Sequence, residues 1–428
     1  MIMPDLRRAR TRGTNGRAGC RPRAHDCRDG NGDGGKVLSV IRGGKSIATA
    51  DMPAWRSAAA VGVGDVFVLV PAHNEEAAIE MAMASVDAQS HPVTHRIVVA
   101  DNCTDATETL VRARPGWECW PTTANTAKKA GGLNQAWRRL RREHAFNEHD
   151  FVLVMDGDSR IDPDFIATAG RALRGEDVGA VGGVFYGDGG GGLLGEVQRN
   201  EYQRYAREIG RRRERWASVL TGTATMFRGR VWFEISAARG AGRIPGTPGE
   251  VYDTLALTED NEITIATKTL GWRAVSPDGC RVYTEVMKTP RELWRQRIRW
   301  QRGALENIRH YGLTRVTARY AGQQAMIAFG LVAMWSYLVV TAMSIGQPMT
   351  FAPFWLGVGL IFVVERVVTV RRRGWRAMLL ALPLVLEAAY DVFQQIVFLR
   401  SVLEILTGKK PHWGHNTTAR FTPCTEMP

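Results

Sequence analysis

Six cysteines are few for a chain of 428 residues, and they form no CxxC pair and no short repeated spacing. Their scatter supports neither a disulfide framework nor a zinc motif, and it fits a reducing compartment. The nine histidines contain no HExxH sequence, so they do not indicate a zinc enzyme either. The first residues are basic but include no apolar segment, so nothing indicates a secretory signal.

Interleaved aromatic residues are missing from the basic parts of the sequence, although the formal net charge is +13. Residues 1–60 hold twelve Lys and Arg against five Asp and Glu, and further basic runs lie at Arg138–Arg142, Arg211–Arg215 and Arg371–Arg373. A surface that binds single-stranded nucleic acid combines cations with stacking aromatic rings, and none of these runs has that pattern. We therefore expect solvated faces, attraction to anionic lipid and no nucleic-acid partner.

Residues 1–60 lack apolar periodicity and are rich in arginine and glycine. This composition is typical of a disordered segment, because it offers too little apolar surface to bury. Recognisable structure begins near Asp65, and an alternative is that translation starts at Met52. The sequence thus predicts a disordered basic segment ahead of the first domain.

From Asp65 onwards, short apolar strands alternate with helical segments. Strands separated by helices of this length indicate βαβ units and a mainly parallel α/β sheet, which we place within residues 61–290. The predicted strands are Val66–Val70, Arg96–Ala100 and Phe151–Met155, and the predicted helices are Ala77–Ala88, Asp105–Arg114, Leu133–His144 and Ile263–Leu270.

Most of the long apolar runs lie after residue 324. Ala325–Ile345 has 21 residues without a charge, and Phe351–Val370 has 20 residues that are apolar apart from one glutamate and one arginine. Each is long enough to span a bilayer as a helix. The arginines at 371–373 then place that end of the second helix on the cytoplasmic side, because basic residues favour the inside.

A third apolar segment, Ala377–Leu399, carries polar residues in its second half. It either spans the membrane or lies at the interface as an amphipathic helix. We expect two to three transmembrane helices within residues 324–400, followed by a basic tail at 401–428.

The segment Asp156-Gly157-Asp158 directly follows a predicted strand. Two carboxylates at a strand end offer the hard oxygen ligands that Mg²⁺ or Mn²⁺ prefers. Such an ion can neutralise the diphosphate of a nucleotide-sugar leaving group. Because the same three residues also form ordinary turns, the motif alone does not decide between the two interpretations.

Five further polar motifs accompany this one, two of them directly after predicted strands. In an open parallel sheet, ligands bind at the carboxyl ends of the strands, so one shared cleft is the economical interpretation. The motifs are Pro71–Glu76, Asp101–Asp105, Lys128–Asn134, Thr258–Asp260 and Gln296–Trp300.

In chain order these motifs read PxxNEE, DNxTD, KxGxLN, DGD, TED and QxxRW. This series resembles the family-2 glycosyltransferases, in particular the processive β-glycan synthases that make cellulose, chitin, hyaluronan and poly-N-acetylglucosamine. The resemblance runs from about Val66 to Arg302. It implies a GT-A, Rossmann-like catalytic domain that binds a nucleotide-diphospho-sugar, followed by membrane helices.

The resemblance also implies roles for individual residues. Asp260 would be the catalytic base, and Asp158 would bind the metal ion, with Asp156 contacting ribose or metal. Residues of the donor pocket would be Pro71, Glu75, Asp101, Lys128, Gly131 and Asp156. Residues at the acceptor or the diphosphate would be Glu259, Gln296, Arg299 and Trp300.

The chemistry of these roles follows from the residue types. An inverting transfer needs one base that takes the proton of the attacking acceptor hydroxyl, and a carboxylate such as Asp260 can do this. Arginine suits the departing diphosphate, and an indole face suits the apolar side of a sugar ring. An alternative for Asp260 is a purely structural role as an acidic residue at the start of a helix.

Residues 291–315 are predicted to form an amphipathic interfacial helix. At 100° per residue, Gln296, Arg299 and Trp300 lie opposite an apolar stripe. A helix resting on the membrane by that stripe would present the QxxRW residues to the catalytic domain. The stripe consists of Trp294, Ile298, Leu305 and Ile308.

The resemblance therefore implies an integral protein of the cell membrane whose catalytic domain lies in the cytoplasm. It would be an inverting glycosyltransferase that depends on Mg²⁺ or Mn²⁺ and extends a β-glycan from UDP-GlcNAc or UDP-glucose. Because a secretion channel needs enough helices to surround a polymer, a homo-oligomer is expected. One alternative is a single transfer to a lipid or protein acceptor. Another is an inactive scaffold, but Asp158 and Asp260 are both present.

Overall fold

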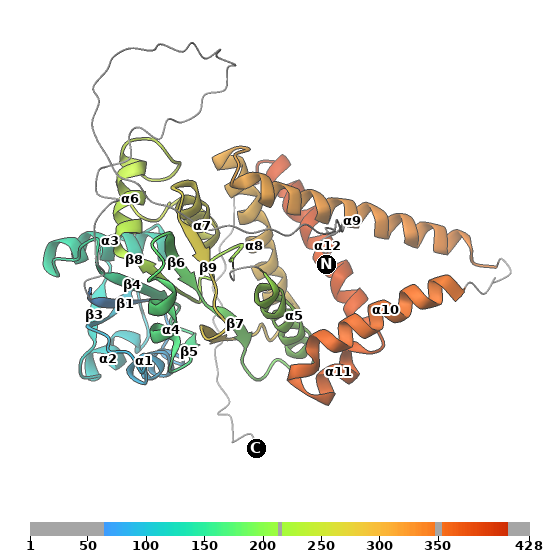
Figure 1. Cartoon of the computed structure of the whole chain (residues 1–428), viewed down its shortest axis with the longest axis horizontal. Helices are drawn as coiled ribbons and strands as arrows, with labels where there is room; N and C mark the ends of the chain where they lie inside the picture. Colours follow the sequence, from blue (N-terminus) through green and yellow to red (C-terminus); the bar gives the residue numbers. More distant parts are fainter. Residues whose placement is uncertain (1–63, 213–215, 347–352, 410–428) are drawn as a thin grey trace, which may run out of the picture. The chain divides into compact units, whose positions relative to one another are not determined.

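The computed structural model describes residues 64–212, 216–346 and 353–409 of the chain. Strands and helices alternate up to residue 290, and helices follow (Figure 1). The predicted disordered segment at residues 1–60, the alternative start at Met52 and the tail beyond residue 409 lie outside the described residues.

Seven strands form the main sheet, in the order β3-β2-β1-β4-β8-β6-β9. The four strands from β3 to β4 run parallel to one another, with Val70 of β1 beside Val98 of β2. These strands are nearly continuous apolar runs because a parallel sheet is covered on both faces. The strands are β1 (Val66–Ala72), β2 (His95–Ala100), β3 (Glu118–Pro121), β4 (Phe151–Met155), β6 (Val178–Gly182), β8 (Ala224–Arg228) and β9 (Arg273–Val275).

The sheet is more mixed than predicted, because β8 runs antiparallel to both of its neighbours. Leu153 of β4 and Val181 of β6 both pair with Met226 of β8. A strand inserted from so far along the chain leaves no local pattern in the sequence. A second, three-stranded sheet has the order β5-β10-β7 and consists of β5 (Arg160–Ile161), β10 (Arg281–Thr284) and β7 (Val184–Gly187).

Each face of the main sheet is covered by its own set of helices (Figure 1). Leu69 packs on Trp137 on one face, whereas Val70 packs among Met83 and Phe165 on the other. Alternate residues of a strand thus serve opposite cores. The first set is α3 (Lys128–Glu143), α6 (Gly229–Gly240) and α7 (Glu259–Thr269), and the second is α1 (Ile79–Asp87), α2 (Thr107–Ala113) and α4 (Phe165–Ala172).

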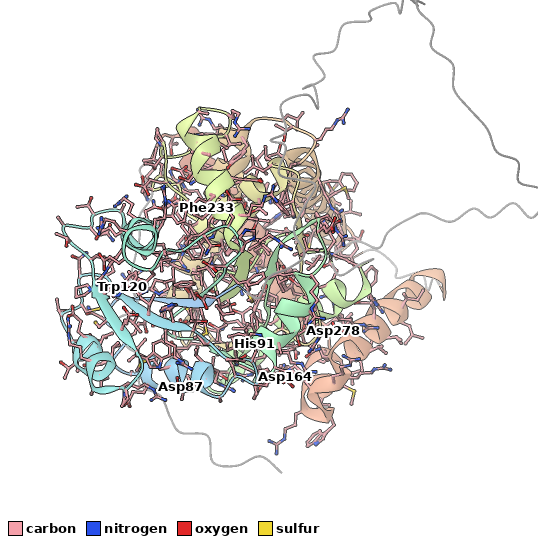
Figure 2. The ribbon with its side chains drawn as sticks, turned by 60° about the vertical axis from the view of Figure 1, so that its left-hand side comes forward. Asp87, His91, Trp120, Asp164, Phe233 and Asp278 are labelled. Atoms are coloured by element: carbon pink, nitrogen blue, oxygen red, sulfur yellow. The ribbon has the colours of Figure 1, made fainter. Side chains whose placement is uncertain are left out.

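Aromatic rings fill much of the core beneath α3 and α6 (Figure 2 labels Phe233 and Trp120). The ring centroid of Trp137 lies 4.9 Å from that of Phe233 and 5.9 Å from that of Trp232. Phe146 contacts the same cluster from the loop after α3. Buried rings of this size stabilise strongly, so α3 is firmly held between the sheet and α6.

α3 begins at Lys128, five residues before the predicted start at Leu133. Two adjacent glycines weaken a helix, which is why the sequence pattern placed the start too late. A Cβ on Gly131 would lie 2.1 Å from Oδ1 of Asn125, so the preceding loop occupies the space of a side chain. The other predicted strands and helices coincide with β1, β2, β4, α1, α2 and α7 to within a few residues.

The last part of the chain is helical. α8 begins with a capping box in which Thr289 and Glu292 exchange hydrogen bonds. It packs along α12, where Trp294 contacts Phe393 with ring centroids 5.8 Å apart. The helices of this part are α8 (Pro290–Tyr311), α9 (Thr317–Met343), α10 (Pro353–Val370), α11 (Trp375–Ala381) and α12 (Val385–Leu406), with a short 3₁₀ turn at Arg371–Arg373. α5 (Gly192–Arg211) comes earlier in the chain, between β7 and β8.

The apolar stripe predicted for α8 is partly covered by protein. Trp294 packs against Phe393, and Ile308 packs against the core beneath α3. At these two positions the stripe contacts α12 and the core of the main sheet. The interfacial arrangement itself stays a prediction.

Among the described residues, one helix, α9, is long and apolar enough to cross a membrane. α11 and α12 together qualify as a second crossing only if they form one span that is bent by 68°. Most of α9 is exposed, including Phe329 at 61% and Tyr337 at 68%. The predicted second span, residues 351–370, corresponds to α10, although residues 351 and 352 lie outside the described part.

Candidate active site

The carboxyl ends of β1, β2 and β4 meet at one edge of the main sheet, where Ala72 pairs with Ala100. Asp101, the first residue after β2, is buried. Its Oδ1 accepts hydrogen bonds from Thr122 at 2.8 Å and from Asn125 at 2.7 Å, and Asn102 adds a third at 3.0 Å. A carboxylate held by three donors is fixed in orientation and can act as a rigid acceptor for a ligand.

Glu75 lies on the loop after β1 and faces the segment after β4. A Cβ on Gly157 would lie 3.2 Å from Cγ of Glu75 and 3.5 Å from the carbonyl oxygen of Pro71. Burial, followed by the charges of Asp158 and Asp156, raises the pKa of Glu75 to about 9. Three carboxyl groups are therefore crowded around one point.

Asp156 follows β4 and is joined to α7 through a lysine. Nζ of Lys129 lies 2.5 Å from Oδ1 of Asp156 and 3.0 Å from Oε1 of Glu259. Burial raises the pKa of Asp156 while the charge of Lys129 opposes that rise. Burial also favours the neutral form of Glu259, but Lys129 outweighs it and holds the pKa of Glu259 below its usual value. Lys129 thus favours the ionised form of both carboxylates, although for Asp156 the effect of burial is larger.

Asp158 forms no ion pair with a cation in the part of the chain that the structure describes. Burial and the neighbouring Asp156 raise the pKa of Asp158 to about 6, and Ser159 donates a hydrogen bond to its Oδ1 at 3.0 Å. Carboxylates that repel one another in this way are stabilised by a divalent cation, and carboxylate oxygens are the ligands that Mg²⁺ and Mn²⁺ prefer. Asp158, Glu75 and Asp156 are therefore the candidate ligands for such an ion.

Asp260 is the second residue of α7 and lies next to Glu259. Its Oδ2 accepts a hydrogen bond from the backbone of Gly222 at 3.2 Å, and its Oδ1 accepts one from Asn261 at 2.7 Å. Burial and the charge of Glu259 raise the pKa of Asp260 to about 6. Asp260, Gly222 and Lys129 line one small cavity. A carboxylate with this pKa can accept a proton near neutral pH.

Two cations converge on the same region from different helices. Burial and the charge of Arg299 lower the pKa of Lys128, which opens α3 in a left-handed conformation with φ of 55°. Arg299 of α8 also acts on Asp156 and Glu259 by its charge. Like charges brought close together favour an anion between them. The region therefore has a part suited to a cation and a part suited to an anion.

The other two residues of the QxxRW motif lie on α8 with Arg299 and are half-buried. Oε1 of Gln296 is a buried oxygen without a hydrogen-bond partner among the described residues. The guanidinium of Arg297 lies 4.4 Å from the ring centroid of Trp300 and covers one face of the indole. An unsatisfied buried acceptor indicates a position where a polar ligand would complete the bonding.

α8 is fitted closely onto the segment that precedes Asp260. A Cβ on Gly303 would lie 2.4 Å from Oγ1 of Thr258, and Nδ2 of Asn307 lies 3.3 Å from the carbonyl oxygen of the same threonine. Only a glycine allows the backbone of α8 to approach the Thr258 side chain this closely. The packing fixes the position of Arg299 relative to Asp260.

The structure brings most of the residues named from the sequence to this edge of the sheet. Gly131 differs from the others because it has no side chain that could contact a ligand. It is buried, and the close approach of Asn125 explains why a glycine is needed there. No individual role was predicted from the sequence for Lys129, Gly303 or Asn307. Lys129 is the lysine of the KxGxLN pattern when that pattern is counted back from Asn134, so the signal was present.

A family model described as "Glycosyltransferase like family 2" matches residues 64–303, more than half of the chain. An N-acetylglucosaminyltransferase of Rhizobium meliloti is 26% identical over 298 residues, which are 65% of this chain and 66% of that protein. A poly-beta-1,6-N-acetyl-D-glucosamine synthase of Staphylococcus aureus is 24% identical over 278 residues, 64% of this chain and 62% of that protein. The matches span somewhat less than two thirds of these relatives' length.

Among solved structures, a mannosyltransferase from Pyrobaculum calidifontis in complex with GDP-Man and Mn²⁺ is similar to this chain. The TM-score is 0.53 at 19% identity, and the match covers 81% of this chain and 88% of that one. Together with the family model, this likeness shows the GT-A fold of nucleotide-sugar transferases, here with a mixed sheet.

Proposed function

Since the chain belongs to glycosyltransferase family 2 and is a transferase, we propose that it moves a sugar from a UDP-sugar to a growing β-glycan at the membrane. The transfer inverts the configuration at the anomeric carbon. The preferred donor is UDP-GlcNAc, with UDP-glucose as the alternative. The names of the two relatives, both of which concern N-acetylglucosamine, support that preference.

One observation carries the proposal: carboxylates and cations are gathered in separate groups at the same sheet edge. The charge of Asp158 raises the pKa of Glu75, whereas the charge of Arg299 lowers the pKa of Lys128. A metal ion bound to a diphosphate would satisfy both groups, since its cation meets the carboxylates and its anion meets the lysine and arginine.

Donor binding is assigned to the loops after β1 and β2 and to the start of α3. Asp101, fixed by Thr122 and Asn125, accepts a hydrogen bond from the base. Pro71 and Glu75 border the nucleotide, and Lys128 meets the diphosphate. Gly131 keeps the start of α3 close to the loop at Asn125, so that Lys128 is held at the donor.

A divalent ion would be held by Asp158 with Asp156 and Glu75, and when bound it neutralises charge on the leaving diphosphate. The chain's own contribution is to hold those carboxylates in place. Lys129 forms ion pairs with both Asp156 and Glu259, so it links the strand end to the TED segment.

Asp260 takes the proton from the acceptor hydroxyl as that oxygen attacks the anomeric carbon. The backbone of Gly222 and Asn261 hold its two oxygens, which leaves the carboxylate fixed in orientation. Gln296 offers a buried oxygen to an acceptor hydroxyl, and Trp300 offers the indole face that Arg297 leaves uncovered. Glu259 sits between Lys129 and the acceptor.

Membrane attachment is proposed through α9, whose apolar side chains are largely exposed. Exposed phenylalanine, valine and tyrosine over 27 residues suit the hydrocarbon of a bilayer. The catalytic domain would lie on the cytoplasmic side, and several copies would join to surround a polymer. A single transfer to a lipid acceptor is the second candidate, because few described helices are able to span.

The test is nucleotide release from membranes that carry the protein, supplied with Mg²⁺ or Mn²⁺ and with UDP-GlcNAc, UDP-glucose or GDP-mannose. Asp260→Asn membranes serve as the control. Release with UDP-GlcNAc that disappears in the control and with chelator supports the proposal. Release with GDP-mannose alone would contradict the donor assignment. Products are then separated by length: a ladder supports chain extension, and a single added sugar supports the second candidate.

A further inference from the structure

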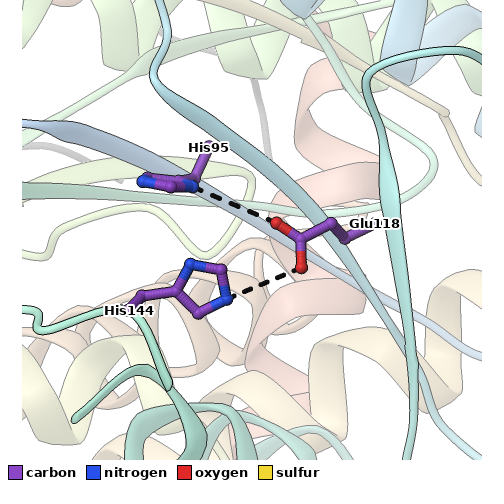
Figure 3. A group of neighbouring side chains, drawn as sticks. All are labelled: His95, Glu118 and His144. Carbon is purple, nitrogen blue, oxygen red and sulfur yellow. Dashed lines mark ion pairs between the residues drawn. The ribbon is translucent and has the colours of Figure 1, made fainter. Parts of the chain in front are cut away.

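Three side chains from separate parts of the sequence meet at the amino ends of β2 and β3 (Figure 3). His95 opens β2, Glu118 opens β3, and His144 follows the last residue of α3. Figure 3 shows the carboxylate of Glu118 beside the two imidazole rings, with one oxygen facing each ring. Asp101 lies six residues beyond His95, about 20 Å away at the rise of a strand, so this cluster is remote from the candidate active site.

The distances in the cluster are too long for direct hydrogen bonds. Nδ1 of His95 lies 4.0 Å from Oε1 of Glu118, and Nε2 of His144 lies 3.6 Å from Oε2 of the same carboxylate. All three ligand atoms lie within 4.8 Å of one another. An ion bonded to two ligands at about 2.1 Å holds them roughly 3.4 to 4.2 Å apart. Modest side-chain rotation brings the widest gap into that range.

Neighbouring residues hold the three side chains in place. Nε1 of Trp120 donates a hydrogen bond to Oε2 of Glu118 at 3.0 Å. The ring of Phe67 stacks on His95 with centroids 4.4 Å apart, and Trp120 contacts His144 at 5.3 Å. Metal-binding side chains are usually oriented by such a surrounding shell of hydrogen bonds and packed rings.

An ordinary ion pair is a poor explanation of this arrangement. The shortest nitrogen–oxygen distances, 4.0 Å from His95 and 3.6 Å from His144, leave the carboxylate of Glu118 without a direct hydrogen bond to either ring. A neutral imidazole does have a lone pair to offer an ion.

We propose that His95, Glu118 and His144 bind a transition-metal ion of the Zn²⁺ type. Two imidazoles and one carboxylate suit Zn²⁺, whereas Mg²⁺ prefers oxygen ligands alone. Three protein ligands leave a fourth position for water. The site is thus distinct in place and in chemistry from the carboxylates at Asp158.

The ion would tie together elements that are otherwise joined weakly. β3 is a four-residue strand at the edge of the main sheet and pairs only with β2 among the described strands. Glu118 lies on this strand, and His144 ends the helix whose first residues, Lys128 and Lys129, reach the active site. Bound metal would therefore stabilise the edge strand and fix the far end of α3.

The test measures Zn²⁺ binding by competition with a chromophoric chelator, using the full-length protein in detergent. All measurements use the double variant Cys20→Ser/Cys27→Ser as the background into which the other substitutions are introduced. Its two cysteines are replaced because they could bind zinc independently. In this background we expect one Zn²⁺ per chain, insensitive to excess Mg²⁺. Glu118→Gln keeps the shape of the side chain. This variant and His144→Ala should each weaken Zn²⁺ binding about 100-fold or more. Asp158→Asn should leave binding unchanged.

A thermal measurement guards against loss of folding in the variants. Without metal, Glu118→Gln should unfold at the same temperature as its background, and only the background should be stabilised by added Zn²⁺. If the background binds no Zn²⁺, or if Glu118→Gln and His144→Ala bind it as tightly as the background, the proposal is overturned. Because the readout is metal binding, the result is independent of any transferase activity.

Discussion

The ammonium group of Lys129 lies 2.5 Å from a carboxylate oxygen of Asp156. The same group lies 3.0 Å from Glu259, so one lysine links the end of β4 to the start of α7. Burial alone would lower the pKa of Lys129, but the two carboxylates outweigh it and raise the pKa above its usual value. The lysine is therefore charged at neutral pH, and it offsets the repulsion between the two acids.

Lys129→Met should lower both activity and stability. Removal of the cation leaves two half-buried carboxylates uncompensated, which costs about 3 kcal/mol of unfolding free energy. We expect nucleotide release to fall at least about 100-fold, as when a preorganised electrostatic group is removed. Activity assays and thermal unfolding check the two effects.

The adjacent lysine provides the matched control. Lys128→Met should weaken donor binding, since Lys128 is assigned to the diphosphate, while the unfolding temperature stays near that of the wild type. Loss of stability in Lys128→Met but not in Lys129→Met would contradict the assignment of the two lysines.

Asp260→Asn tests the catalytic base directly. The amide keeps the size of the side chain but cannot accept a proton, so kcat should fall about 10²- to 10⁴-fold with little change in donor affinity. Asp164→Asn is the control, because the side chain of this aspartate is exposed just before α4, where it accepts a hydrogen bond from Ser90. Equal activity of the two variants would exclude Asp260 as the base.

The pH dependence should show the same carboxylate. Burial and Glu259 raise the pKa of Asp260 to about 6. A base must be deprotonated to act, so kcat/KM should be constant above this pKa and fall about tenfold per pH unit below it. Glu259→Gln removes a charge that raises this pKa and should move the fall to lower pH. If the fall in kcat/KM stays at the same pH in Glu259→Gln, the titrating group is instead Asp158, whose pKa is also near 6.

Local patterns predicted the strands that carry the site but not the way they are arranged. β4 was predicted at its observed limits because an apolar run ends sharply at Asp156. The insertion of β8 beside it was not predicted, because pairing between Leu153 and Met226 depends on contacts that no short segment encodes. The active-site acids were thus identified from strand ends, whereas the mixed sheet was not.

The histidine cluster shows the same limit more sharply. His91 and His95 are four residues apart, a spacing that would place both side chains on one face of a helix. Here the chain between them is not helical and contains Pro92 (Figure 2 labels His91). His95 instead meets Glu118 and His144, which come from two other elements. Only the register of β2 with β3 and the length of α3 bring them together.

The ion pair between Arg239 and Glu262 should make a large contribution to stability. Nη2 of Arg239 donates to both carboxylate oxygens of Glu262, at 2.6 and 2.7 Å, and neither side chain is exposed. Arg239→Met leaves a buried charge that only Tyr311 still contacts, at a cost of about 3 to 5 kcal/mol.

The double variant Arg239→Met/Glu262→Leu separates this cost from the intrinsic value of the pair. Because it removes both charges, it should be more stable than Arg239→Met alone. Thermal unfolding of the three proteins measures the difference. A double variant that is less stable than Arg239→Met would contradict the cost assigned here to an uncompensated Glu262.

Gly303→Ala should separate α8 from the catalytic residues. The added Cβ would lie 2.4 Å from Oγ1 and 2.6 Å from Cγ2 of Thr258, two residues before Asp260. Overpacking of this kind costs about 1 to 3 kcal/mol, and the displaced helix would carry Arg299 away from the diphosphate. We expect a lower unfolding temperature together with a fall in kcat of about tenfold or more, because misplacement by 1 Å can have such an effect.

Two further variants identify the contact that is responsible. Thr258→Ala removes the two atoms that clash, so Gly303→Ala/Thr258→Ala should recover part of the activity that Gly303→Ala loses. Gly322→Ala in α9 adds a methyl group where no atom lies within 4 Å, and it should leave activity unchanged and helix stability equal or slightly higher. If Gly303→Ala were as active as Gly322→Ala, the close packing of α8 on Thr258 would not be what positions Arg299.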